Sequence, residues 1–248
     1  RGIFNQDIRT TNTPGFEWPY GTGKFAVFST GLTIAGYVNN SLRMAVASYT
    51  GEYLLGRCIN GVFFNDSTFK LYRVSRGDNQ NNNPDWARWG LMVPFGAPFK
   101  DINNNGTYEP SIDLPGVNDA SQTIFVCLTD ANPSSHSISE GFSGGTLPLG
   151  AEVHLTAWAY DNPGYEKMQF LKWEIINKST TAWDSTIFTI VNDPDLGDAA
   201  DDYIGCDTSR NLGYCYNGDN LDGDGSARTY GANPPAVGLT FLNCSNSD

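Results

Sequence analysis

Short segments rich in β-branched and aromatic residues recur along the chain, and each is bounded by Gly, Asn, Asp or Ser. Alternation is clearest over residues 151–160, where aliphatic side chains take one set of positions and polar or aromatic side chains the other. A period of two residues is typical of a strand with one buried face. Comparable segments occur at residues 24–29, 32–38, 42–50, 61–66, 68–75, 123–130, 170–178 and 185–191.

The spacing of these segments predicts consecutive antiparallel strands. Residues 38–41, with the sequence VNNS, are a predicted turn between two of them. No segment has a convincing helical period over more than two turns. We therefore predict an all-β fold, an antiparallel, jelly-roll-like β-sandwich with long calcium-binding loops. Residues 1–23 are predicted to form an N-terminal arm, and residues 24–248 a single sandwich domain with acidic loops at 101–113 and 192–225.

The most acidic stretch, residues 192–225, carries nine aspartates against one cation, Arg210. These carboxylates repel one another unless a positive partner closes the segment. Ca²⁺ is the predicted partner, because it accepts six to eight oxygen ligands in irregular loops and the stretch holds no His. A solvated acidic loop is the alternative, but the interleaved tyrosines are atypical of a disordered tail. The predicted ligands are Asp193, Asp195, Asp198, Asp201, Asp202, Asp207, Asp219, Asp222 and Asp224.

A second acidic stretch, residues 101–113, matches the beginning of an EF-hand-type calcium loop, in which alternate oxygens converge and Gly permits a sharp turn. Position 12, normally a bidentate Glu, is Ile112, and Pro110 would break an exiting helix. The stretch therefore predicts a calcium loop without flanking helices; a plain Asn-Gly turn is the alternative. The predicted ligands are Asp101, Asn103, Asn105, Thr107, Glu109 and Asp113.

Five cysteines suit an oxidising compartment, but an odd number leaves at least one unpaired or paired between chains. Cys206 and Cys215 bracket a short polar loop and are predicted to form a disulfide, worth about 2–3 kcal/mol. Cys127 lies in the apolar run IFVCL and is predicted to be a buried small hydrophobe. The partners of Cys58 and Cys244 stay open.

The formal net charge of −12 argues against nucleic acid and anionic membrane as partners, because both require basic patches. No apolar run reaches the roughly 18 residues of a membrane span. The first residue is Arg1, which we interpret as the start of a processed chain after removal of a signal peptide. The chain is thus expected outside the cell or at its surface.

Catalytic motifs are not evident. His136 and His154 are the only two histidines, no G-x-S-x-G or H-E-x-x-H motif occurs, and His136 is expected to be solvent-exposed. Two carboxylates suffice for glycoside hydrolysis, and Glu152 and Glu174 are the first pair to consider; solvent-facing strand residues are the simpler interpretation. The tryptophans could form a sugar-stacking platform, but we expect most of them to fill the core. The chain is predicted not to be an enzyme.

Several longer phrases carry a family likeness, above all VNDPDLGDAADDYIGCDTSRNLGYCYNGDN, VPFGAPFKDINNNGTYEPSIDLPGVNDASQTIFVCLTD and YGANPPAVGLTF. The chain resembles the N-terminal region of large secreted surface proteins of Bacteroidota and Ignavibacteria-type bacteria that carry a type IX secretion sorting domain. The resemblance implies an extracellular location, a β-rich fold and calcium binding in both acidic stretches. It further implies O-glycosylation at residues 66–68 and 184–186, two Asp-Ser-Thr triplets.

These observations lead to one expectation of function. We expect an extracellular, calcium-stabilised structural protein that self-associates as a surface-layer or filament-forming subunit. Residues 1–23 and an unpaired cysteine are the features that could link subunits. The alternative is a secreted carbohydrate-binding module or glycoside hydrolase, with glycans as partners.

Overall fold

The computed structural model describes residues 1–7, 13–138 and 144–243. Strands make up 42% of the chain and helices 7%, and the paired strands are antiparallel, so the predicted all-β sandwich class is confirmed. Cys244 lies outside the described residues. None of the helices in the described ranges is long and apolar enough to cross a membrane.

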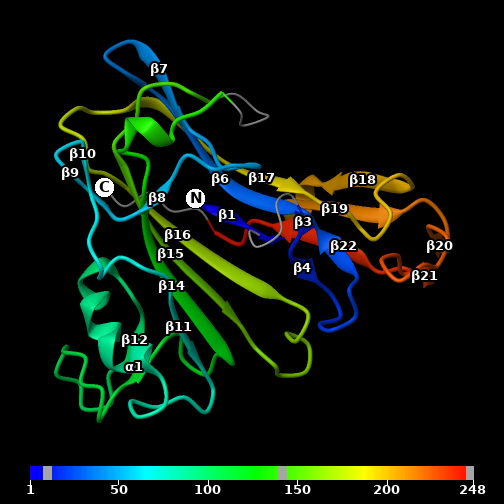
Figure 1. The fold of residues 1–248 in the computed structure, drawn as a ribbon, viewed down its shortest axis with the longest axis horizontal. Helices are drawn as coiled ribbons and strands as arrows, with labels where there is room; N and C mark the ends of the chain where they lie inside the picture. Colours follow the sequence, from blue (N-terminus) through cyan, green and yellow to red (C-terminus); the bar gives the residue numbers. More distant parts are fainter. Residues whose placement is uncertain (8–12, 139–143, 244–248) are drawn as a thin grey trace.

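Two antiparallel sheets form the body of the molecule (Figure 1). In the first sheet the long strand β6 pairs with β17 along one side and with β1 and β7 along the other. In the second sheet β14 and β15 are central, β16 pairs with β15, and β11 and β8 pair with β14. The first sheet comprises β1 (Ile3–Phe4), β6 (Ser29–Val38), β7 (Ser41–Ala45) and β17 (Asp184–Asp193). The second comprises β8 (Leu54–Leu55), β11 (Tyr72–Ser75), β14 (Gln122–Thr129), β15 (Ala151–Ala159) and β16 (Gln169–Asn177).

The main core fills the space between these sheets. Alternation along β15 sends Val153 and Leu155 into it, where they join Ile34 of β6 and Tyr53. Each of these four side chains is almost completely buried. Burying an aliphatic or aromatic side chain stabilises the fold by roughly 1.5–3 kcal/mol, so this core is the principal source of stability in the body.

The opposite face of the second sheet is covered by a short helical segment. It consists of α1 (Pro84–Arg88) and two 3₁₀ turns, η1 (Trp89–Leu91) and η2 (Val93–Phe95). Asn83 caps α1 by accepting the Asp85 N–H, and Pro84 occupies the first turn, where no backbone donor is needed. Trp89 is fully buried against Tyr72 and Phe125 in a second core.

A third region, which we call the acidic lobe (residues 194–240), extends from the end of β17 away from the body (Figure 1). Its sheet has the order β18–β19–β22, and its small core contains Leu196 and Cys215 together with Ala26. The lobe contains β18 (Asp202–Asp207), η4 (Thr208–Arg210), β19 (Leu212–Asn217), β20 (Leu221–Asp222), β21 (Gly231–Ala232) and β22 (Ala236–Thr240).

Short hairpins complete the fold. At the N-terminus, β1 pairs with Thr30 and Gly31 of β6, so the beginning of the chain lies on its own body. The remaining pairs are β20 with β21, β2 (Gln6–Asp7) with β3 (Thr13–Pro14), β4 (Phe16–Glu17) with β5 (Phe25–Val27), β9 (Arg57–Ile59) with β10 (Val62–Phe64), and β12 (Phe99–Lys100) with β13 (Leu114–Pro115).

Candidate functional site

The loop at residues 101–113 is closed at its base by the β12–β13 pair, in which Lys100 lies opposite Leu114. Within the loop, the Asp101 carboxylate accepts the backbone N–H groups of Asn105 and Gly106 at 3.2 and 2.7 Å. Glu109 Oε2 accepts the side-chain amides of Asn103 and Asn105, both at 2.7 Å. Four of the six predicted ligands are therefore brought together on the inside of one turn.

Asp113 has a different position from the other five residues. It is 1% exposed, and its two oxygens accept the backbone N–H groups of Ile102 at 2.9 Å and Glu109 at 2.7 Å. It thus ties the two ends of the loop together. Thr107 donates its backbone N–H to Asn105 Oδ1 at 2.7 Å. Thr107 is at position 7 of the loop, where an EF-hand-type loop binds calcium through the backbone carbonyl.

The loop is anchored on the helical segment. The Tyr108 hydroxyl donates to the Trp86 carbonyl at 2.6 Å, and Trp86 Nε1 donates to the Pro110 carbonyl at 2.9 Å. Burial and, to a smaller extent, the Asp113 charge raise the pKa of Tyr108, which keeps the hydroxyl protonated as a donor. Side chains at the loop are consequently held in place before any ligand arrives.

The carboxylates of residues 192–225 separate into a half-buried group, a group around the buried Asp222, and several surface turns. In the first group, Asp193 accepts the Tyr49 hydroxyl at 3.1 Å and lies near Asp195 and Asp202. Burial, together with the charges of Asp193 and Asp202, raises the pKa of Asp195 to about 6. These three carboxylates repel one another at neutral pH, which is the electrostatic problem that a bound cation would remove.

The second group surrounds Asp222, which is completely buried. Its oxygens accept the backbone N–H groups of Asp198, at 2.9 Å, and Tyr230, while Asp201 Oδ2 accepts the Gly223 N–H at 3.0 Å. The chain passes so close at Gly197, with φ of +76°, that any Cβ there would collide with the Asp222 carboxylate. Carboxylate-to-backbone bonds thus hold the turns of the lobe together.

Three oxygen atoms in the acidic lobe are buried without a hydrogen-bond partner among the described residues: Asp201 Oδ1, Asp202 Oδ1 and Asn217 Oδ1. Asp202 and Asn217 lie directly opposite each other in the β18–β19 pair, so their side chains share one face. A buried acceptor without a donor costs about 1–3 kcal/mol, and more when charged. Asp202 Oδ1 and Asn217 Oδ1 are oxygen acceptors of the kind that Ca²⁺ takes as ligands, while Asp201 belongs to the group around Asp222.

Asp207, Asp219 and Asp224 lie in turns apart from these buried oxygens. Asp207 caps η4 through the Ser209 N–H at 3.0 Å and also pairs with Arg210. Asp219 accepts the Leu221 N–H at 2.7 Å, and Asp224 accepts the Ser226 N–H at 2.8 Å. Within the described ranges no group of three or more His, Cys, Asp and Glu side chains is arranged to hold a metal ion. Calcium binding in both stretches stays a prediction.

The predicted disulfide between Cys206 and Cys215 is not formed, and both thiols are free. The reason is strand register: Cys215 lies opposite Ile204, and Cys206 lies opposite Gly213, so the two cysteines are diagonal neighbours. Diagonal pairs are about 7–8 Å apart, beyond the reach of a disulfide. Burial, followed by the charge of Asp202, raises the pKa of Cys215 to about 12. Cys127 is buried, as predicted, and Cys58 is buried and free.

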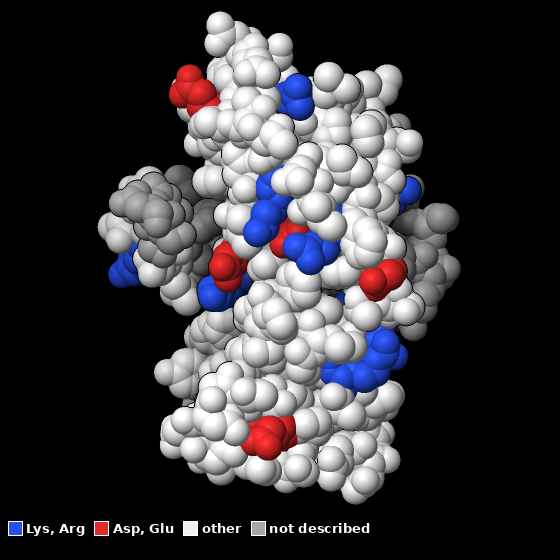
Figure 2. Space-filling view, turned by 90° about the vertical axis from the view of Figure 1, so that its left-hand side faces the viewer, with Lys and Arg blue, Asp and Glu red and all other residues white. Residues whose placement is uncertain are grey.

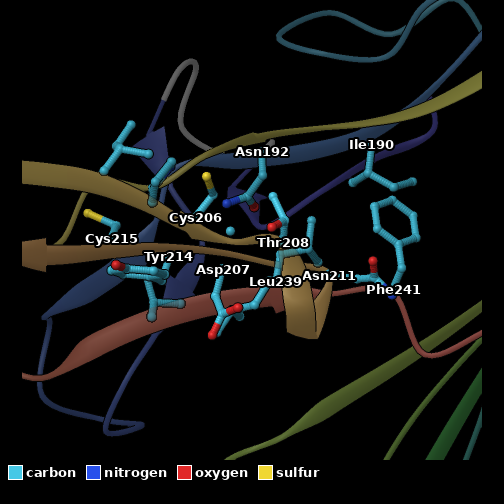
Figure 3. A pocket seen from close by; sticks show the side chains of 15 residues that line it. Ile190, Asn192, Cys206, Asp207, Thr208, Asn211, Tyr214, Cys215, Leu239 and Phe241 are labelled. Carbon is cyan, nitrogen blue, oxygen red and sulfur yellow. The ribbon is translucent and has the colours of Figure 1, made fainter.

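A groove of about 470 Å³ runs between β17 and the sheet of the acidic lobe. Figure 3 shows Ile190 and Phe241 facing each other at one end of it, and Cys206 and Cys215 as separate side chains along it. Its walls are largely apolar and carry no group of converging catalytic side chains among the described residues. The groove therefore lies at the boundary between the body and the acidic lobe.

A second cavity, of about 440 Å³, is polar and lies on the helical side of the second sheet. It is lined by Arg57, Glu152, His154, Glu174 and Lys178, among others. The carboxylate pair singled out in the sequence, Glu152 and Glu174, is therefore brought to one cavity. Arg57 and Lys178 were not predicted; a cation next to the strand residues offers no pattern that sequence alone could detect.

The expectation that His136 is exposed is wrong, because its side chain is only 2% exposed. His136 Nε2 lies 2.8 Å from the Asp130 carbonyl, and Nδ1 lies 3.5 Å from Glu52 Oε2. Glu52 also accepts the backbone N–H groups of Val46, Ser137 and Gly145, which closes two loops over one carboxylate. Polar residues of a Ser- and Gly-rich segment are thus buried by contacts distant in sequence.

The expectation that most tryptophans fill the core is met in part, because Trp89 lies in the second core and Trp173 and Trp183 pack against the main core. Trp89 is fully buried, and the other five are partly buried.

Comparisons of the chain with protein-family models, with curated proteins and with solved structures found no match.

Proposed function

We propose that the chain is an extracellular, calcium-stabilised structural protein that assembles into a surface layer or filament. The loop at residues 101–113 carries this proposal, because its Asp101, Asn103, Asn105 and Glu109 side chains converge in one turn anchored on the body. The spacing of these residues and the Gly106 turn are those of a calcium loop. The proposal takes a Kd of about 10⁻⁴ M or somewhat tighter, at the tight end of the range for extracellular calcium sites.

The acidic lobe supports the same proposal independently. Its buried, unpartnered oxygens at Asp201, Asp202 and Asn217 leave an electrostatic cost that Ca²⁺ would offset. Ca²⁺ would also offset the repulsion from Asp193 and Asp202 that, together with burial, raises the pKa of Asp195. Calcium would therefore act as a structural ion that closes the lobe and fixes its turns.

Self-association is supported by the edge of the first sheet. β17, ten residues long, pairs with β6 on one side and is the last strand in the order of that sheet. Ile187 is 63% exposed and Phe188 44% exposed on it. A long edge strand with apolar side chains is a template for pairing with another chain, so β17 is the proposed contact between subunits.

The test is thermal unfolding of the purified chain in millimolar calcium and in excess chelator, with light scattering for size. A site with Kd between 10⁻⁴ and 10⁻⁵ M contributes about 1–3 kcal/mol at 1 mM calcium. For a chain of this length that corresponds to a rise in midpoint of roughly 3–10 °C. Assemblies that dissociate with chelator would support the complete proposal; a monodisperse monomer with calcium present would overturn the assembly part.

A matched pair of variants assigns the effect to the loop. Glu109→Gln keeps an oxygen that accepts the Asn103 and Asn105 amides but removes the charge, so the calcium-dependent rise in midpoint should shrink while the midpoint in chelator is kept. Asp119→Asn is the control, because Asp119 is exposed, lies outside the loop and has a positive φ that Asn tolerates. An equal calcium response in both variants would contradict a site in this loop.

A further inference from the structure

We propose that the polar cavity formed by β9, η2, β15 and β16 is a binding site for a small hydroxylated carboxylate, of the uronic acid class. The cavity volume of about 440 Å³ is within the range of small-molecule sites. Figure 2 shows basic and acidic side chains next to one another at the middle of the face on which β9 and α1 lie. This inference does not depend on calcium or on self-association.

The basic side of the cavity holds a hydrogen-bond donor that lacks an acceptor. Arg57 lies over the ring of Phe95, with its guanidinium carbon 5.3 Å from the ring centroid, and its Nε is buried without a hydrogen-bond partner. Lys178 lines the same cavity. A guanidinium fork matches the planar geometry of a carboxylate, and the pairing is strengthened by burial. An anionic group of the ligand is therefore expected at Arg57.

The acidic side is built on two neighbouring strands. Glu152 is 1% exposed and accepts the Cys58 N–H, at 2.9 Å, and His154 Nε2, at 2.9 Å. Burial by itself would raise the pKa of Glu152, but these hydrogen bonds outweigh it and the pKa is lowered, so the carboxylate stays ionised. The contact with Glu152 orients the His154 imidazole through Nε2, and the second ring nitrogen, Nδ1, takes no part in that contact.

Glu174 supplies acceptors at the opening. It lies directly opposite His154 in the β15–β16 pair, its side chain is 50% exposed, and its nearest cation, Lys172, is 3.9 Å away. Gly96, with φ of +88°, ends the η2 wall, and a Cβ there would be 3.4 Å from Glu174 Oε2. Gly96 and Glu174 therefore lie next to each other in the cavity wall.

The combination of charges narrows the class of ligand. Phosphates are disfavoured because Glu152 and Glu174 already offset the charges of Arg57 and Lys178, so a dianion would add more unbalanced negative charge than a singly charged carboxylate. Apolar ligands are disfavoured because they would leave these charged groups without partners. A sugar acid carries one carboxylate for Arg57 and several hydroxyl donors for Glu174, so it satisfies both sides. Neutral sugars lack the group that Arg57 requires.

The experiment is calorimetric titration of the complete chain with D-glucuronate, D-glucose and L-alanine. Glucuronate is expected to bind in the millimolar range, typical of a single sugar unit, and at least tenfold more tightly than glucose or alanine. Preferred binding of alanine would assign the cavity to amino acids and overturn the proposal. Equal binding of glucose and glucuronate, or no binding of glucuronate, would overturn it as well.

Two variant pairs make the test specific to the cavity. Arg57→Gln and Lys178→Gln should each weaken glucuronate binding, Arg57→Gln by at least tenfold, because the anion loses its bidentate partner. Arg73→Gln and Lys100→Gln, at exposed positions outside the cavity, should bind normally. Thermal midpoints confirm folding; if Arg57→Gln is unfolded, Lys178→Gln decides. Unchanged binding in the folded variants would contradict the assignment, and the calcium response, measured separately, would be unaffected.

Discussion

The body and the acidic lobe are held together by different interactions. In the body, two sheets bury a continuous layer of aliphatic and aromatic side chains, among them Ile34 and Leu155. Carboxylates that accept backbone N–H groups fix loops in both regions, as Glu52 does in the body and Asp222 in the lobe, but in the lobe the buried apolar residues are few. Apolar packing depends less on pH and on bound cations than carboxylates do, so the lobe should be the more sensitive of the two regions. The difference teaches where solution conditions can act on this molecule.

The largest expected effect comes from a cavity in the body. Leu155→Ala, at a site 1% exposed, should lower the free energy of unfolding by about 3–4 kcal/mol. The matched change in the lobe, Leu196→Ala, should cost only about 2 kcal/mol because it has fewer packed neighbours to lose. Urea unfolding followed by tryptophan fluorescence measures both. Equal losses would show that the lobe relies on apolar packing as much as the body does.

Removal of one carboxylate tests the lobe directly. Asp222→Asn keeps one acceptor but turns an NH₂ group toward a backbone N–H, so about 2 kcal/mol should be lost. The loss should be confined to the lobe, and hydrogen exchange should rise in β18 and β19 and not in β14 and β15. Asp119→Asn, at the surface of the body, is the control. Increased exchange throughout both sheets would contradict the separation.

Chelation should separate the two regions further, at about 1–3 kcal/mol if calcium binds as proposed. Amides of β18 and β19 and of the loop at residues 101–113 should lose protection from exchange, while those of the β14–β15 pair keep it. Hydrogen exchange measured by mass spectrometry with and without calcium distinguishes these two sets of amides. Identical protection in both conditions would leave the acidic stretches as solvated surface.

The smallest effect is that of pH. Asp195 has a folded pKa of about 6 against 3.8 in the unfolded chain, so the folded state holds its proton more tightly. Stability from this group is complete below pH 4 and is lost as the pH rises through 6. In chelator the free energy of unfolding should therefore rise on going from pH 7 to pH 5, and the thermal midpoint with it. The gain should be about 1 kcal/mol or less, because Asp195 is partly exposed. Asp195→Asn should reduce that rise, while the part due to Asp202, whose pKa burial also raises, should remain; an unchanged pH profile in this variant would contradict the assignment.

Sequence patterns predicted the body well and its cavities poorly. Alternation over residues 151–160 predicted a strand that the structure places at Ala151–Ala159, because one buried face imposes a period of two. Likewise, the local spacing of Asp101 to Glu109 predicted side chains that do meet. Local order along the chain is what such patterns record.

Contacts between distant segments left no such pattern. Arg57 joins Glu152 through the packing of β9 beside the second sheet, and Lys178 joins it through the pairing of β16 with β15. His136 is buried through Glu52, far away along the chain. The disulfide prediction failed for a related reason: the spacing of Cys206 and Cys215 is local, but the two-residue offset in β18–β19 register decides their separation. Register and tertiary packing are set by the whole fold.

The pairing of β17 with β6 has a mechanical consequence. β17 runs from Asp184 to Asp193 beside β6, and its end continues directly into the acidic lobe. When β6 is held at its Val38 end, a pull on the lobe is directed along the strand axis, so the hydrogen bonds between the two strands bear the tension together; a hold at the Ser29 end, which pairs with Asp193, would open them one after another. Shear of this kind gives a strand pair its greatest resistance to rupture, which would suit a molecule that contacts its neighbours along β17.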